Sequence, residues 1–282
     1  SKQLALTKRA VATGWLGNWS FALAPEAHGD QVNRTDELPG QMMEAVNSGK
    51  LFLSLTLLAF GSVLGWLLTY KIAGTDAGFE ALAICLTIAG LTFVLQLILY
   101  FVNQDRLFYV AVFYGALGLN LVWFMFSLFM PLFWLETVSL LAKCSASGIL
   151  VFLCIANLWR GYRQLADRWQ RIGDPLVIGR VNAQFHTIDW EQIQKRLRYD
   201  AEIFIPGLPK NATSVLSALL LISMLAGLNF RTAYPVLSMF AWGVPCAVFG
   251  SFFFQLVGNR MSEASAIIDL QKKYGFVFKI RK

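Results

Sequence analysis

Few side chains in this sequence belong to the types that carry out catalysis or hold metals. Its 282 residues include two histidines, His28 and His186, and four cysteines. Each cysteine lies inside a long apolar run, none has CxxC spacing, and no histidine is near one of them. Zinc sites and disulfide frameworks need such residues in clusters. We therefore expect no metal and no cofactor, and interpret the cysteines as small apolar packing residues. They are Cys85, Cys144, Cys154 and Cys246.

The sequence also lacks the usual nucleophile and phosphate-binding motifs. Ser145 and Ser147 lie beside Gly148, but no histidine in the same apolar run can activate a serine. No glycine-rich loop ends in Lys-Ser or Lys-Thr, so these residues encode no ATP-driven motor. No DxxD pair lies in an apolar run to hold a metal and a diphosphate. We predict no catalytic residues and favour a protein that is not an enzyme.

Two charged side chains interrupt the longest apolar stretch, residues 107–159. They are Glu136 and Lys143, which would share a helix face if a helix began before Glu136. Because a helix that crosses a bilayer needs about 20 apolar residues, we predict a transmembrane hairpin of 107–134 and 137–159, with Pro131 kinking or ending its first arm. Charges at membrane depth are often functional. Near the turn they cost little and Lys143 can snorkel, so we favour anchoring over a gate or ion site.

The same reasoning predicts four further spans. The chain is 56% hydrophobic and 15% charged, whereas soluble domains have about 25% charged residues. The further apolar runs are 51–70, 79–102, 213–230 and 236–257. We therefore predict an all-α integral membrane protein, a polytopic bundle of about six transmembrane helices with cytoplasmic amphipathic helices, in an inner or plasma membrane.

Uncharged polar residues within these spans are the second set of candidates. Gln96, Asn120 and Gln255 each lie in an apolar run, and we favour interhelical hydrogen bonds over contact with a transported solute. No span centre holds Asp or Glu, which argues against a proton-coupled carrier. Gly61 and Gly65 form a GxxxG pattern, which allows two helices to approach closely.

Basic helices follow the fourth span. Apolar residues recur at helical spacing from Leu158 to Ile172, so that helix is predicted to leave the bilayer and end at Gly173. Asp189 resembles an N-cap, with Gln192 three residues later, before a second amphipathic helix. The cations of the two helices are Arg160, Arg163, Arg168, Arg171, Lys195, Arg196 and Arg198. We expect them to face anionic lipid or a partner protein; nucleic acid is unlikely because acidic residues dilute the patch.

The distribution of cations predicts the topology. With six spans, 21 of the 24 Lys and Arg residues fall on one side, and the other three are Lys71, Lys143 and Arg231. The positive-inside rule makes the basic side, with both termini, cytoplasmic. The predicted regions are a cytoplasmic or interfacial segment 1–50, four spans in 51–159, a basic cytoplasmic segment 160–211, a transmembrane hairpin 212–257 and a basic tail 258–282. We also expect an interfacial anchor near Trp15 and Trp19, and a short sheet between the tail and 176–181.

Three functions are compatible with this pattern. The first is a non-enzymatic membrane subunit that docks other membrane proteins or forms a homo-oligomer. The second is a channel or carrier for a small solute or ion, with polar residues such as Asn120 lining its path. The third is a lipid-modifying enzyme with Asp189, Glu191 or His186 near the headgroups. The first agrees best with spans that hold neither a catalytic set nor a coupling carboxylate.

Overall fold

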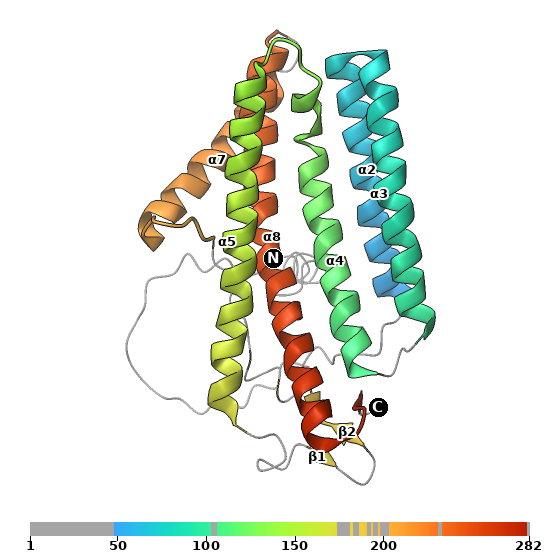
Figure 1. The fold of residues 1–282 in the computed structure, drawn as a ribbon. Helices are drawn as coiled ribbons and strands as arrows, with labels where there is room; N and C mark the ends of the chain where they lie inside the picture. Colours follow the sequence, from blue (N-terminus) through green and yellow to red (C-terminus); the bar gives the residue numbers. More distant parts are fainter. Residues whose placement is uncertain are drawn as a thin grey trace, which may run out of the picture. The chain divides into compact units, whose positions relative to one another are not determined.

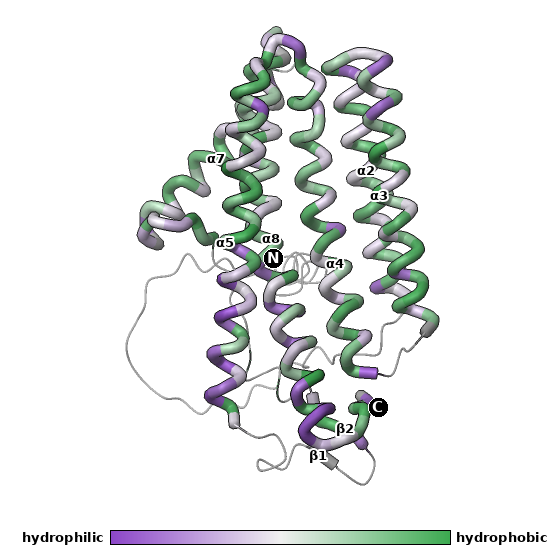
Figure 2. Tube along the Cα trace, viewed as in Figure 1, coloured by the Kyte–Doolittle hydropathy of each residue, from purple (hydrophilic) through white to green (hydrophobic). Residues whose placement is uncertain are grey.

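The computed structural model describes residues 48–102, 106–173, 203–230 and 233–280, together with 181–182, 186–190, 193 and 197. Long helices dominate these residues (Figure 1). They are α2 (Ser48–Ala73), α3 (Thr75–Val102), α4 (Leu107–Ser127), α5 (Leu140–Ile172), α7 (Lys210–Phe230) and α8 (Pro235–Tyr274). Of these, α2, α3, α4, α5 and α8 are long and apolar enough to cross a membrane, and the predominance of helices confirms the predicted helical class. Hydrophobic residues fill most of their length (Figure 2).

The turn between α4 and α5 corrects one predicted boundary. The first arm of the predicted hairpin does not run to residue 134, because α4 ends at Ser127 and a 3-10 helix follows at Met130–Phe133. Pro131 lies in that 3-10 helix, where its missing N–H costs no helical hydrogen bond. Helix α5 begins only at Leu140, after its N-cap Ser139. Glu136 therefore lies in the turn and shares no helix with Lys143.

Helices α5 and α8 both continue beyond their apolar portions. As predicted, α5 ends at Gly173, which has a φ of 78°. The last predicted span, 236–257, lies within α8, which continues without a break from Pro235 to Tyr274. Residues 258–261 contain no proline, and the single glycine among them, Gly258, lowers helix propensity without ending the helix.

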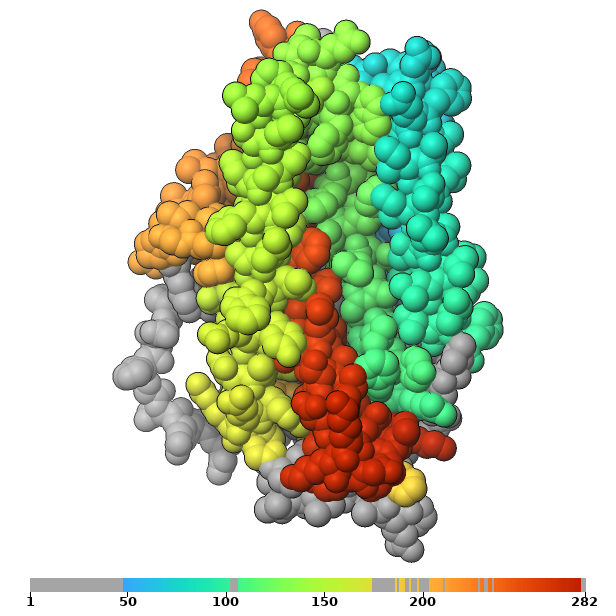
Figure 3. All heavy atoms as spheres, in the orientation of Figure 1, coloured from blue at the N-terminus to red at the C-terminus, as the bar shows by residue number. Residues whose placement is uncertain are grey.

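Helix α8 lies between α5 and α4, and its C-terminal half is visible between them in Figure 3. It runs antiparallel to α4, since Gly250 lies against Met125 and Phe126 while Gly118 lies against Val257. Helix α5 follows the turn after α4, so α5 and α8 run in the same direction (Figure 1).

The α2–α3 hairpin packs against the other side of α4. The predicted GxxxG pattern is used here. A Cβ on Gly61 would lie 2.9 Å from the Cα of Phe124, and one on Gly65 would lie 2.9 Å from the Cβ of Ser127. The two glycines therefore allow α2 to approach the backbone of α4.

A small sheet covers the end of α8. Strand β1 (Val181–Asn182) pairs antiparallel with β2 (Thr187–Ile188), and β2 pairs in parallel with β3 (Lys279–Ile280). The predicted sheet with the tail is present, but the tail pairs with residues 187–188. Residues 174–180 lie outside the described part of the chain.

The apolar stripe of the second predicted amphipathic helix faces protein. Trp190, Ile193 and Leu197 are buried in a core that also contains Phe113 and Ile267. The stripe is buried because the ends of α4 and α8 and the tail residue Phe278 pack around it. This surface is therefore unavailable to lipid.

Candidate functional site

Helices α5 and α8 approach each other closely where they cross. A Cβ on Gly161 would overlap the carbonyl oxygen of Gln255, and a Cβ on Gly258 would overlap the carbonyl oxygen of Leu158. Each helix therefore places a glycine against the backbone of the other helix, at a distance that leaves no room for a side chain. The crossing lies just beyond the apolar run 140–159, whose length of about 30 Å at 1.5 Å per residue matches the hydrocarbon core of a bilayer.

Buried carboxamides hold this crossing together. The side chain of Gln255 donates a hydrogen bond of 2.5 Å to the side-chain oxygen of Asn157. The nitrogen of Asn157 donates to the carbonyl of Leu153 at 2.8 Å and to that of Phe204 at 3.2 Å. Both amide side chains are almost fully buried. Asn157 thus connects α5 to α8 and to the segment 203–206, as the interhelical interpretation of Gln255 requires.

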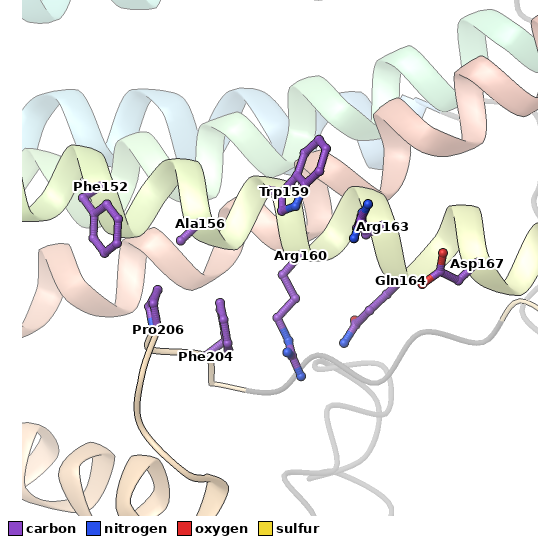
Figure 4. Close-up of a pocket in the computed structure, with 9 residues that line it drawn as sticks. All are labelled: Phe152, Ala156, Trp159, Arg160, Arg163, Gln164, Asp167, Phe204 and Pro206. Carbon is purple, nitrogen blue, oxygen red and sulfur yellow. The ribbon is translucent and has the colours of Figure 1, made fainter.

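An open groove of about 400 Å³ lies between α5 and the segment 203–206. Figure 4 shows Phe152 and Ala156 of α5 facing Pro206 and Phe204 at one end, and Arg160 and Gln164 extending from the same face farther along the helix. The described residues that line the groove are Phe152, Ala156, Trp159, Arg160, Arg163, Gln164, Asp167, Phe204 and Pro206. One end is therefore apolar and the other is polar with two cations and one acid.

Aromatic rings support both cations. The guanidinium of Arg160 lies 4.3 Å from the ring centre of Phe204, and that of Arg163 lies 5.2 Å from the ring centre of Trp159. Such cation–π contacts are attractive and restrict the orientation of the guanidinium fork. Trp159 itself is 58% exposed, as expected for an aromatic residue at a membrane interface.

Two other basic candidates on α5 do not line the groove. Arg168 and Arg171 lie farther along α5 and line none of it. Lys195, Arg196 and Arg198, with Glu191, lie outside the described residues. The structure therefore brings together Arg160 and Arg163 of the predicted basic set.

Of the remaining polar candidates, Asn120 and Lys143 have hydrogen-bond partners within the chain. Asn120 donates to the carbonyl and the hydroxyl of Ser54, at 3.0 and 2.9 Å. Lys143 donates to the carbonyl of Phe133 at 2.9 Å and thereby closes the turn that contains the exposed Glu136. Gln96 is fully buried, and its carboxamide has no hydrogen-bond partner among the described residues.

A second polar cluster lies beneath the small sheet. Glu263 is buried, pairs with Arg260 and accepts a hydrogen bond of 2.7 Å from the indole of Trp190. The ring of Tyr114 receives the cations of Arg260 and Lys50, each 5.1 Å from its centre, and Lys50 donates to its hydroxyl. This cluster joins α2, α4 and α8 to the segment at 190.

Sequence reasoning did not identify Asn157, Phe204, Glu263 or the two crossing glycines. Asn157 resembles the other amides in apolar runs, which is the one signal that marks it. The thiols also differ in part from expectation, since Cys85 and Cys246 are buried but Cys144 is exposed. Among the described residues, no three His, Cys, Asp or Glu side chains lie close enough to hold a metal.

Comparisons with protein-family models, curated proteins and solved structures gave no match.

Proposed function

We propose that this protein is a non-enzymatic integral membrane subunit that docks other membrane proteins or copies of itself. The observation that supports the proposal is that polar side chains in the spans bond to neighbouring helices of the same chain, as Asn120 does to Ser54 and Gln255 to Asn157. These residues hold the bundle together, which leaves the outward faces for interaction.

The outward faces of α3 and α5 offer surfaces for docking. Only 17% of the most apolar stretch of each helix is buried within the chain. Gly90 on α3 and Gly148 on α5 have no atom within 4 Å of a Cβ placed on them. Small outward residues allow a second helix to pack closely in lipid, where van der Waals contact drives association.

Purification in mild detergent tests the proposal. A stoichiometric partner or a defined homo-oligomer is expected, and Gly90→Leu should dissociate it while the separated chain keeps its thermal stability. Gly61→Leu is the contrasting variant, because it clashes with Phe124 inside the chain and should lower that stability. A lone monodisperse monomer, unaffected by Gly90→Leu, would overturn the proposal.

We also propose six crossings with both termini in the cytoplasm. Helix α5 ends, and α8 begins, at opposite ends of the bundle, so the chain must return between them. In this proposal the return is made by helix α7, which packs against α8 (Figure 1). Its apolar portion, Asn211–Gly227, is shorter than the five long spans, but Ser238 and Ser223 secure it to α8 through hydrogen bonds of 2.7 and 3.0 Å. The cation count then orients the bundle.

A channel or carrier is the second candidate, and the Asn120 pairing gives it a direct test. If Asn120 lines a path, flux of a small ion into proteoliposomes should disappear in Asn120→Leu. Under the docking proposal no flux is expected in either protein. The lipid-modifying enzyme has less support, because the ring of His186 is stacked on that of Phe276, with 4.5 Å between the ring centres.

A further inference from the structure

We propose that the groove between α5 and the segment 203–206 is a binding site for an anionic phospholipid. Its phosphodiester would lie at Arg160 and Arg163, and one acyl chain would lie along Phe152, Ala156 and Pro206. The inference does not depend on the docking function, because it concerns a lipid in the groove on α5, whereas docking is tested at Gly90 on α3.

The polarity of the groove matches the two parts of a phospholipid. Phe152 is 59% exposed on the apolar portion of α5, and Arg160 follows it two turns later. At 1.5 Å per residue the two positions are about 12 Å apart along the helix. The groove therefore crosses from the level of acyl chains to the level of headgroups, where arginine is favourable.

The charge of the groove matches one negative charge. Among the described residues that line the polar end, Arg160 and Arg163 contribute two cations and Asp167 one carboxylate, which sum to a net charge of +1. A phosphodiester headgroup such as that of phosphatidylglycerol carries one negative charge. Guanidinium groups bind phosphate oxygens with charge-assisted hydrogen bonds, and the aromatic rings beneath them restrict the forks in advance.

The wall of the groove is held rigid by the helix crossing. The carbonyl of Phe204 accepts a hydrogen bond from Asn157, whose own oxygen is held by Gln255. Phe204 in turn lies against Arg160. A wall positioned before the ligand arrives reduces the ordering cost of binding.

Native mass spectrometry of the full chain in detergent tests the site. Phosphatidylglycerol and phosphatidylcholine with the same acyl chains are added at equal concentration, and the bound lipid is measured. We expect phosphatidylglycerol to be retained preferentially. Arg160→Gln/Arg163→Gln should lower its retention by about fivefold for each arginine, which corresponds to about 1 kcal/mol per cation. If the double variant elutes as unfolded protein, Arg163→Gln alone replaces it, because that side chain is exposed.

Two matched variants separate the groove from general electrostatic attraction. Arg168→Gln/Arg171→Gln makes the same charge change on the same helix outside the groove. It should change the retention of phosphatidylglycerol by less than about twofold, whereas each groove arginine is expected to contribute about fivefold. Ala156→Phe fills the apolar end without changing charge and should lower retention. An equal loss in the Arg168/Arg171 variant, or no loss in Ala156→Phe, would overturn the proposal.

Two further measurements in the same experiment identify the class of ligand. Equal retention of phosphatidylcholine would show that the headgroup charge is not recognised, and would overturn the anionic assignment. Glycerophosphoglycerol, which has the headgroup but no acyl chains, should fail to displace the lipid. Displacement by this soluble compound would instead indicate a site for free phosphate esters and would also overturn the proposal.

Discussion

Gln255 of α8 donates its side-chain hydrogen bond to Asn157 of α5, 98 residues earlier in the chain and within one turn of the two crossing glycines. A buried amide pair and a backbone contact therefore lie at the same point. The pair fixes the rotation of each helix about its axis, and the glycines fix the distance between them. Both the groove and the segment 203–206 depend on this junction, because Asn157 also bonds to Phe204.

The amide pair should behave as a coupled unit in a double-mutant cycle. Asn157→Leu and Gln255→Met each leave a buried amide without its partner, and each should cost about 1 to 2 kcal/mol. The double variant should cost less than the sum by about 1 kcal/mol, because both single variants lose the same Asn157–Gln255 hydrogen bond. Unfolding in mixed micelles measures these values. Strict additivity would show that the two side chains do not interact.

The glycine crossing should tolerate no side chain. Gly161→Leu forces α5 away from the carbonyl of Gln255 and should cost about 3 kcal/mol, seen as a lower melting temperature in detergent. Gly148→Leu adds the same side chain on the same helix in open space and should leave the fold intact. Similar melting temperatures for the two variants would contradict the close approach.

The helices themselves could be predicted because a bilayer imposes one strong constraint. A segment that crosses the lipid must satisfy its backbone hydrogen bonds internally, so it is helical and about 20 apolar residues long. A run of that length can be recognised directly in the sequence. The end of α5 at Gly173 was predicted for an equally local reason. The end of α4 at Ser127 was not, because residues 128–134 are as apolar as the helix before them.

The site could not be predicted because its contacts join distant residues. Asn157 meets Phe204 and Gln255, 47 and 98 residues away, and no spacing rule relates them. Gly161 and Gly258 belong to no GxxxG pattern, whereas Gly61 and Gly65 do and were recognised. The stripe Trp190, Ile193 and Leu197 was recognised as apolar, but whether lipid or protein covers such a stripe depends on the tertiary fold.

Removal of Glu263 should loosen the region beneath the small sheet. Glu263→Leu leaves the indole of Trp190 and the guanidinium of Arg260 without this acceptor, and should cost about 2 kcal/mol. Asp269→Leu on the same helix removes an exposed acid and should have little effect. Hydrogen exchange at residues 187–190 is the measurement, with faster exchange expected in Glu263→Leu alone. Equal exchange in the two variants would show that Glu263 does not hold this segment.

Cysteine labelling should establish whether α7 crosses the membrane. In a background with the four native cysteines replaced by alanine, single cysteines are placed at the exposed positions Asp76, Leu208, Tyr234 and Asp269. Six crossings require Leu208→Cys and Asp269→Cys to share one side and Asp76→Cys and Tyr234→Cys the other. The positive-inside rule further requires an impermeant maleimide to label the second pair in intact cells and the first pair only after permeabilisation. Labelling of Leu208→Cys and Tyr234→Cys from the same side would show that α7 does not span, and reversal of both pairs would invert the orientation while leaving the six crossings in place.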